Sequence, residues 1–106
     1  MTKTKELLAV LDMPEEEQWE WALVNNHRKT YRESLSDLAF RLTPEGGEEW
    51  MDAKILVWEY RNPEEKQIEE YKFRKLNSAN DWFMSSEATA TDRVIAALIA
   101  KQEAKE

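Results

Sequence analysis

The sequence predicts an all-α fold, a compact bundle of about five to six short amphipathic helices formed by residues 1–106 as a single helical domain. Three observations support this prediction. The chain has only two glycines, adjacent at Gly46 and Gly47, which leaves few positive-φ positions for hairpin turns. Helix-start motifs, in which a capping residue precedes a proline or a glutamate, recur along the chain. Between them, apolar residues recur at intervals of three and four.

The first helix is expected over residues 3–11, where three leucines form an apolar stripe. It should stop near Pro14, because proline lacks the amide hydrogen that a helix interior needs. Asp12-Met13-Pro14-Glu15 combines a capping residue, a first-turn proline and a glutamate. This motif predicts a second helix that continues to about Asn25.

The second helix carries aromatic residues on two sides. At roughly 100° per residue, Trp19, Ala22 and Leu23 share one side of the helix. Trp21 and Val24 point in nearly the opposite direction. We expect the side with Trp19 to face the core and the side with Trp21 to need a second partner.

The third helix has the clearest amphipathic pattern in the chain. Thr30 and Glu33 form a capping box that predicts its start. Its apolar positions follow helical spacing at Tyr31, Leu35, Leu38, Ala39 and Leu42. Phe40 lies off this apolar face. The helix should end at Thr43-Pro44-Glu45-Gly46-Gly47, which contains both proline and glycine.

Residues 48–61 allow two interpretations. Ile55-Leu56-Val57-Trp58 is continuously apolar and partly β-branched, as in a buried strand. The residues from Glu48 to Lys54 favour a helix. We interpret the segment as a buried helix. The alternative is a strand near residues 54–60, paired with one around residues 71–74, which would make the fold α+β.

Asn62-Pro63-Glu64-Glu65 repeats the helix-start motif and predicts a helix from Pro63 to about Leu76. Ile68 and Tyr71 are expected to be buried in this helix. The basic cluster Lys72-Phe73-Arg74-Lys75 would then complement the helix dipole at the C-terminus.

A loop over residues 77–81 and a short aromatic segment, Trp82-Phe83-Met84, are expected before the last helix. Thr89 or Thr91 should cap that helix. Its apolar face is formed by Val94, Ile95, Leu98 and Ile99.

Composition and charge argue against several classes of function. Fifteen Lys and Arg residues against 22 Asp and Glu residues give a formal net charge of −7. This charge opposes generic binding to nucleic acid and to anionic membranes. The absence of cysteine excludes disulfides and thiolate chemistry. The N-terminal residues resemble neither a secretory signal nor a membrane span, so we expect a cytoplasmic protein.

No pattern of catalytic residues is present in the sequence. His27 is the only histidine, and its neighbours Asn26, Arg28 and Lys29 are typical of a solvated turn. The chain has no nucleophile elbow, phosphate-binding loop, dinucleotide fingerprint or calcium loop. We therefore expect that the protein is not an enzyme and that it uses no cofactor and no metal ion.

Five tryptophans are the most distinctive feature of the composition. Large aromatic side chains are usually highly buried, so we expect most of the tryptophans to fill the core. Trp21 and Phe40 lie off the main apolar faces of their helices and mark a candidate surface for a protein partner or for a homo-oligomer. The acidic part of this candidate surface is formed by Glu16, Glu17 and Glu20.

Two basic clusters support an alternative function. The first contains Arg28, Lys29 and Arg32, and the second contains Arg74 and Lys75. Together with a tryptophan that stacks on a base, either cluster could hold the phosphates of a nucleotide. The alternative is therefore a protein that binds and sequesters a small ligand such as a nucleotide.

Two segments of the chain are Ser36-Asp37-Leu38-Ala39-Phe40-Arg41-Leu42 and Val94-Ile95-Ala96-Ala97-Leu98-Ile99-Ala100-Lys101. Both resemble segments of small accessory proteins encoded by tailed bacteriophages. In that family a similar helix is followed by a Trp-rich middle and a similar C-terminal end. The resemblance implies a setting in the host bacterial cytoplasm and a host protein as partner. It implies an inhibitor or modulator of a host nuclease or defence complex, similar to an anti-CRISPR protein, and supplies no catalytic residues.

Overall fold

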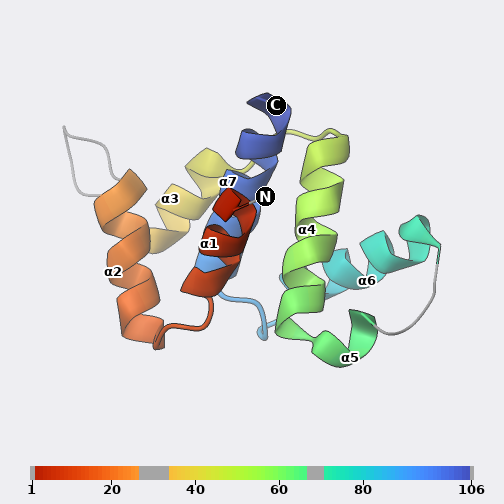
Figure 1. Cartoon of the computed structure of the whole chain (residues 1–106), viewed down its shortest axis with the longest axis horizontal. Helices are drawn as coiled ribbons and strands as arrows, with labels where there is room; N and C mark the ends of the chain where they lie inside the picture. The colour runs from red at the N-terminus through yellow and green to blue at the C-terminus, as the bar shows by residue number, and fades with distance from the viewer. Residues whose placement is uncertain (1, 27–33, 67–70, 106) are drawn as a thin grey trace.

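The computed structural model describes residues 2–26, 34–66 and 71–105. These residues form seven helices: α1 (Thr2–Val10), α2 (Glu15–Asn26), α3 (Leu35–Leu42), α4 (Glu48–Arg61), α5 (Pro63–Lys66), α6 (Lys72–Met84) and α7 (Ala90–Lys105) (Figure 1). No strand occurs within the described ranges. The all-α prediction is confirmed, with the short α5 bringing the number of helices above the expected range.

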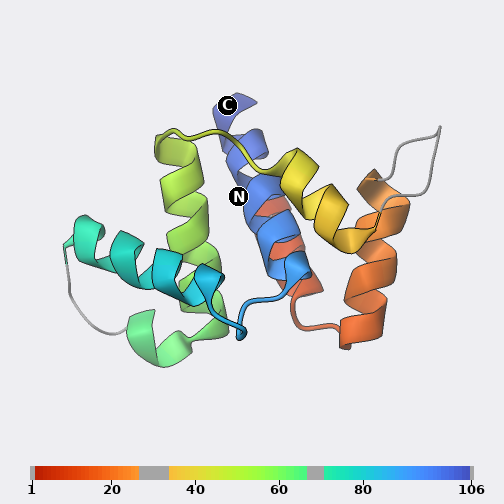
Figure 2. The ribbon, with the colours of Figure 1, turned by 180° about the vertical axis from the view of Figure 1, so that it is seen from behind.

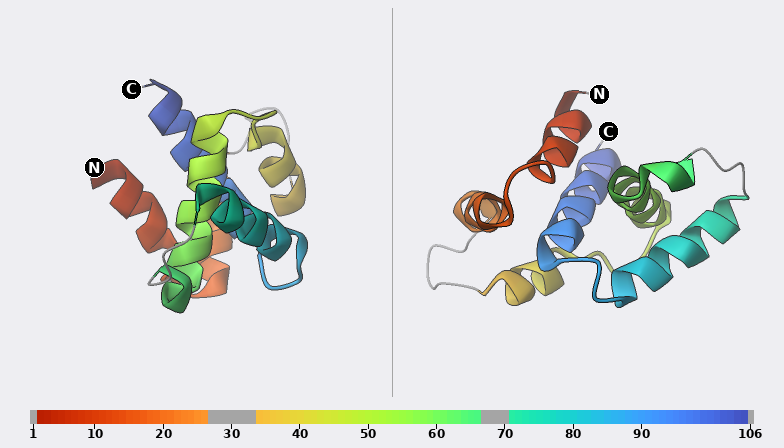
Figure 3. Two further views of the ribbon diagram at one scale, coloured as in Figure 1. Left: turned by 90° about the vertical axis from the view of Figure 1, so that its right-hand side faces the viewer. Right: turned by 90° about the horizontal axis from the view of Figure 1, so that it is seen from below.

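Helix α7 forms the centre of the fold. Apolar residues lie on every side of it, and six of them are buried: Val94, Ile95, Ala96, Ala97, Ile99 and Ala100. A helix that is apolar around its circumference must be enclosed by neighbours, and α7 contacts α1, α2, α3 and α4. Seen from below, it lies between α2 and α3 on one side and α4 and α6 on the other (Figure 3).

The buried side chains form two clusters. The larger cluster comes from α1, α4, α6 and α7, and the smaller one from α2, α3 and α7. Trp21 and Leu98 pack against both clusters and therefore join them. The radius of gyration is 13.5 Å, close to the value of about 13 Å expected for a compact chain of this length.

Residues 48–61 form helix α4, so the alternative of a strand near residues 54–60 is wrong. The helix begins after Gly47, whose φ of 105° is accessible to glycine and unfavourable for other residues. Helix α4 contacts both α7 and α6 (Figure 1). Its continuous apolar run is explained by these two neighbours, because residues on more than one side are buried: Ala53, Ile55, Val57 and Trp58.

The predicted helix over residues 63–76 is wrong. Tyr71, inside the predicted helix, is extended with φ −62° and ψ 144°, and α6 begins at Lys72. The basic cluster therefore occupies the start of a helix, and the predicted loop at residues 77–81 is helical. Tyr71, which was expected to be buried, is 84% exposed. Ile68 lies outside the described residues.

Ion pairs with α4 explain why basic residues occupy the first turn of α6. Lys72 Nζ lies 2.7 Å from Asp52 Oδ1 and 3.1 Å from Glu48 Oε1. Lys75 Nζ lies 3.1 Å from Glu59 Oε2. Because the helix dipole favours basic side chains at the other end of a helix, these tertiary contacts outweigh the local preference.

Side-chain caps start two of the helices. Ser34 caps α3, and its hydroxyl oxygen accepts a hydrogen bond from the Asp37 amide at 3.1 Å. The predicted cap, Thr30, lies outside the described residues. The predicted cap of α7 is confirmed: Thr89 Oγ1 accepts from the Asp92 amide at 3.2 Å, and Asp92 Oδ2 accepts from the Thr89 amide at 2.8 Å.

Candidate functional site

The orientation of α2 is determined by a polar residue, Gln18. Its Nε2 donates hydrogen bonds to the backbone oxygens of Leu11, at 3.0 Å, and Met13, at 2.7 Å. The last carbonyl groups of a helix have no partner within that helix. Gln18 therefore satisfies the backbone where α1 ends, and its side chain is only 7% exposed.

Turning Gln18 inward also turns Trp21 inward and Trp19 outward. Trp21 and Ala22 follow Gln18 by three and four residues and therefore share its face of the helix. Ala22 is fully buried and Trp21 is half-buried against both core clusters, whereas Trp19 is 42% exposed. The expectation that Trp19 faces the core and Trp21 points away from it is wrong.

The outward side of α2 combines an exposed tryptophan with acidic side chains. We define the α2 outer face as five exposed residues within about half of the helix circumference: Glu16, Glu17, Trp19, Glu20 and Val24. The sequence has no Lys, Arg or His between residues 12 and 26. The charge of the three glutamates is therefore not neutralised by a basic residue of α2 itself.

The start of α2 is tied to α4. Tyr60 Oη donates a hydrogen bond to Asp12 Oδ2 at 2.5 Å. This bond to Asp12, together with burial and the negative charge of the carboxylate, raises the pKa of the Tyr60 hydroxyl. The α2 outer face thus belongs to a helix whose preceding turn is anchored to α4 and which lies at one end of the long axis of the molecule (Figure 1).

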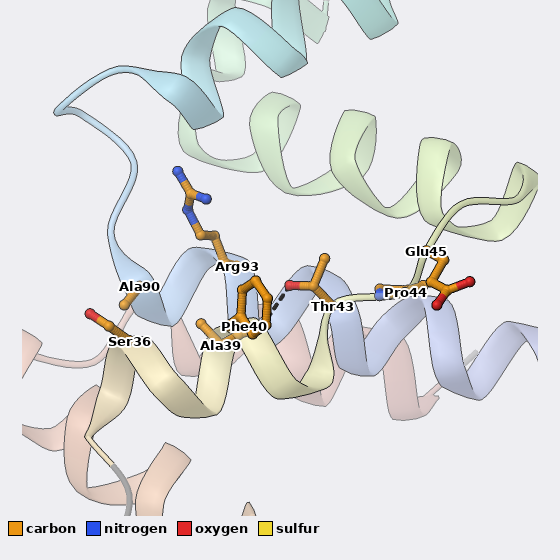
Figure 4. Close-up of a pocket in the computed structure, with 8 residues that line it drawn as sticks. All are labelled: Ser36, Ala39, Phe40, Thr43, Pro44, Glu45, Ala90 and Arg93. Carbon is orange, nitrogen blue, oxygen red and sulfur yellow. Dashed lines mark hydrogen bonds between the residues drawn. The ribbon is translucent and has the colours of Figure 1, made fainter.

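Phe40 lies on a different surface. It is 85% exposed, in agreement with its position off the apolar face of α3. Seen from behind, α3 and α6 lie on either side of α7 (Figure 2). Phe40 lines an open groove of about 720 Å³, which we call the Phe40 groove and whose other lining residues are Ser36, Ala39, Thr43, Pro44, Glu45, Ala90 and Arg93 (Figure 4).

Trp21 and Phe40 are not brought together. Trp21 lines a separate hollow with Lys3 and Leu7 of α1 and with Leu98 of α7. The two hollows have no lining residue in common. The predicted partner surface is therefore divided: its three glutamates lie beside Trp19, and Phe40 lies in its own groove.

The basic residues of the alternative ligand site do not favour a phosphate site. Outside the described residues lie His27, Arg28, Lys29 and Arg32. In the second cluster Arg74 is exposed, but Lys75 pairs with Glu59. Its neighbour Lys72 is also paired, and hydrogen bonds to Asp52 and Glu48 raise the pKa of its ammonium group. Carboxylates of α4 thus already occupy both lysines of this cluster.

One carboxylate, Asp92, is buried. Its Oδ1 lies 3.4 Å from Arg61 Nε, and its Oδ2 accepts the hydrogen bond from the Thr89 amide. Burial raises the pKa of Asp92, against the opposing effects of the hydrogen bonds to Thr89 and the charge of Arg61. Because Asp92 is inaccessible to solvent, it cannot contact a substrate. It joins the end of α4 to the start of α7.

Among the described residues, no three His, Cys, Asp or Glu side chains are grouped so that they could hold a metal ion. None of the helices described is long and apolar enough to cross a membrane. The α2 outer face and the Phe40 groove are two exposed surfaces that combine a large aromatic side chain with charged residues. No known protein family matches the chain, and no curated protein or solved structure is similar to it.

Proposed function

We propose that this chain is a non-enzymatic binding protein that uses the α2 outer face to bind a basic surface on another protein. The observation that carries the proposal is Trp19, which is partly exposed among the glutamates of a helix anchored by Gln18 and by the turn before it. A tryptophan in this position keeps a large apolar area in contact with water. Tryptophan is also among the residues that contribute most to binding energy at protein interfaces.

The charge of the α2 outer face determines the kind of partner. Three glutamates lie around Trp19, and the whole chain carries a net charge of −7. Charged residues at the rim of an interface steer association and select a partner of opposite charge. The proposed contact therefore has an apolar centre at Trp19 and a rim that attracts Lys and Arg.

The partner that we propose is a host protein in the bacterial cytoplasm, such as a nuclease or a defence complex. This part of the proposal is supported by the resemblance of residues 36–42 and 94–101 to phage accessory proteins. Proteins that act on nucleic acid carry basic surfaces that contact phosphates. An acidic protein bound to such a surface would exclude the nucleic acid and inhibit or modulate the partner.

The proposal is tested by comparing which proteins are recovered from a bacterial lysate on three immobilised forms of the chain. These are the wild type, the Glu16→Lys/Glu20→Lys variant and the Trp19→Ala variant. Loss of about 2 kcal/mol or more at a binding hot spot corresponds to a loss of affinity of about thirtyfold. We therefore expect specific partners to be recovered by the wild type and strongly depleted on both variants.

A matched control distinguishes the effect of the α2 outer face from the effect of the net charge of the chain. Glu64 of α5 and Glu87 of the loop before α7 are exposed acidic residues outside α2. The variant Glu64→Lys/Glu87→Lys changes the net charge by the same amount and should retain the partners. Equal depletion by both charge variants, or undiminished recovery on Trp19→Ala, would contradict the proposal.

A further inference from the structure

The Phe40 groove combines a protruding aromatic ring with a hollow beside it. The remaining uncharged residues of its lining are small or compact: Ser36, Ala39, Thr43, Pro44 and Ala90. Phe40 contributes the only large apolar side chain among the described lining residues (Figure 4). The surface thus offers an aromatic side chain for insertion and, next to it, space to receive one.

The two remaining residues of the lining carry opposite charges and lie at different positions along the groove. Arg93 lies toward the start of α7 and Glu45 lies beyond the end of α3, with Phe40 between them in the view of Figure 4. Both charged residues are exposed, and neither forms an ion pair within the described part of the chain. Arg93 donates one hydrogen bond to the backbone oxygen of Phe83. This bond positions the guanidinium group, whose other N–H groups stay available.

We propose that the Phe40 groove binds the same groove of a second copy of this chain, in a two-fold symmetric dimer. A two-fold axis that passes beside Phe40 reverses the order of the charges along the groove. Arg93 of each copy then faces Glu45 of the other, and at the centre each Phe40 ring lies beside the other ring, in the hollow of the other copy. On this surface a positive group, an aromatic ring and a negative group follow one another. Such a surface is complementary to a reversed copy of itself, as a two-fold interface requires.

Eight described residues line the groove, fewer than the roughly 20–30 residues that each partner contributes to a typical stable interface. We therefore expect a dimer that dissociates on dilution. The Phe40 groove and the α2 outer face share no residue. Dimerisation is measured on the purified chain alone, so its failure and the failure of the proposed binding function are distinguishable.

A charge exchange between two variants tests the pairing of Arg93 with Glu45. In a dimer of Glu45→Lys copies both contacts are positive with positive, and in a dimer of Arg93→Glu copies both are negative with negative. A mixed dimer of the two variants has two attractive contacts. In sedimentation equilibrium, each variant alone should remain near 12.6 kDa. The equimolar mixture should move toward twice that mass, as the wild type does at the same concentration.

A second pair of variants tests the role of the aromatic ring without altering Arg93. Phe40→Asp should abolish the rise in mass with concentration. Phe73→Asp, which changes a similarly exposed phenylalanine of α6 at 78% exposure, should leave the rise unchanged. A wild type that stays monomeric up to about 1 mM, well above the dissociation constants of most specific complexes, would overturn the proposal. Dimerisation that persists in Phe40→Asp, or a mixture no heavier than its separate components, would also overturn it.

Discussion

Helix α7 is enclosed by its neighbours, whereas α2 packs against the rest of the protein along one side. In α7, apolar side chains lie around the whole helix, so no single face has to be selected for burial. In α2, aromatic residues lie on two faces, and the hydrogen bonds of Gln18 decide which of them turns inward. Apolar burial thus places the enclosed helix α7. The orientation of the peripheral helix α2 depends instead on hydrogen bonds to the backbone oxygens where α1 ends.

The largest expected effect concerns the enclosed helix. Ile99 is fully buried in α7, and truncation to alanine leaves a cavity that the surrounding helices fill only in part. We expect Ile99→Ala to lower the free energy of unfolding by about 2–5 kcal/mol, as measured by urea denaturation. Val24→Ala on the α2 outer face should change it by less than about 0.5 kcal/mol. Effects of equal size would contradict the difference between the two helices.

A smaller effect is expected from Gln18. Gln18→Ala removes both hydrogen bonds to the backbone oxygens of Leu11 and Met13. Because a buried acceptor left without a partner is costly, the free energy of unfolding should fall by about 1–2 kcal/mol. Asn25 provides the control, since its exposed amide donates to the Trp21 oxygen within the same helix. If Asn25→Ala destabilised the protein as much as Gln18→Ala, the stabilising role assigned to the hydrogen bonds of Gln18 would be contradicted.

The third prediction concerns the pH dependence of the contact between α7 and α4. Burial raises the pKa of Asp92 in the folded protein above its ordinary value of 3.8. The folded state therefore holds the proton more tightly than the unfolded state does. The stabilising contribution of Asp92 is present in full below the ordinary pKa and is lost as the pH rises through the raised pKa.

Asp92→Asn removes this titration while keeping an oxygen that can accept the hydrogen bond from Thr89. The unfolding free energy of the wild type, minus that of Asp92→Asn, should therefore decrease as the pH rises from about 3 to about 7. Other acidic residues are common to both proteins and cancel in the difference. A difference that stays constant or increases with pH would show that burial of Asp92 is not the dominant effect.

Most of the helices could be predicted because their signals are local. The apolar residues between 94 and 99 and the capping box at Thr89 locate the buried part and the start of α7. The choice of helix over strand at residues 54–60 followed from the helix-favouring residues before them. The break between α5 and α6 could not be predicted in this way, because it accompanies ion pairs from Lys72 and Lys75 to carboxylates of α4.

The candidate site was predictable in part for the same reason. The exposure of Phe40 agrees with its position off the apolar face of α3, and the exposure of Glu16, Glu17 and Glu20 agrees with their charge. The exposure of Trp19 was missed because it depends on contacts that Gln18 makes outside its own helix. A signal was present, since Gln18 is the one uncharged polar side chain among the glutamates that begin α2.

The orientation of α2 and the function proposed for its outer face are tested together by measuring unfolding free energy and partner recovery for Trp19→Ala and Trp21→Ala side by side. The half-buried Trp21 joins the two core clusters, so its truncation should cost about 2 kcal/mol or more of stability. Trp19→Ala should change stability by less than about 0.5 kcal/mol and strongly reduce recovery of the partner. The reverse ranking, with Trp19 required for stability and Trp21 for binding, would contradict both the orientation of α2 and the function proposed for its outer face.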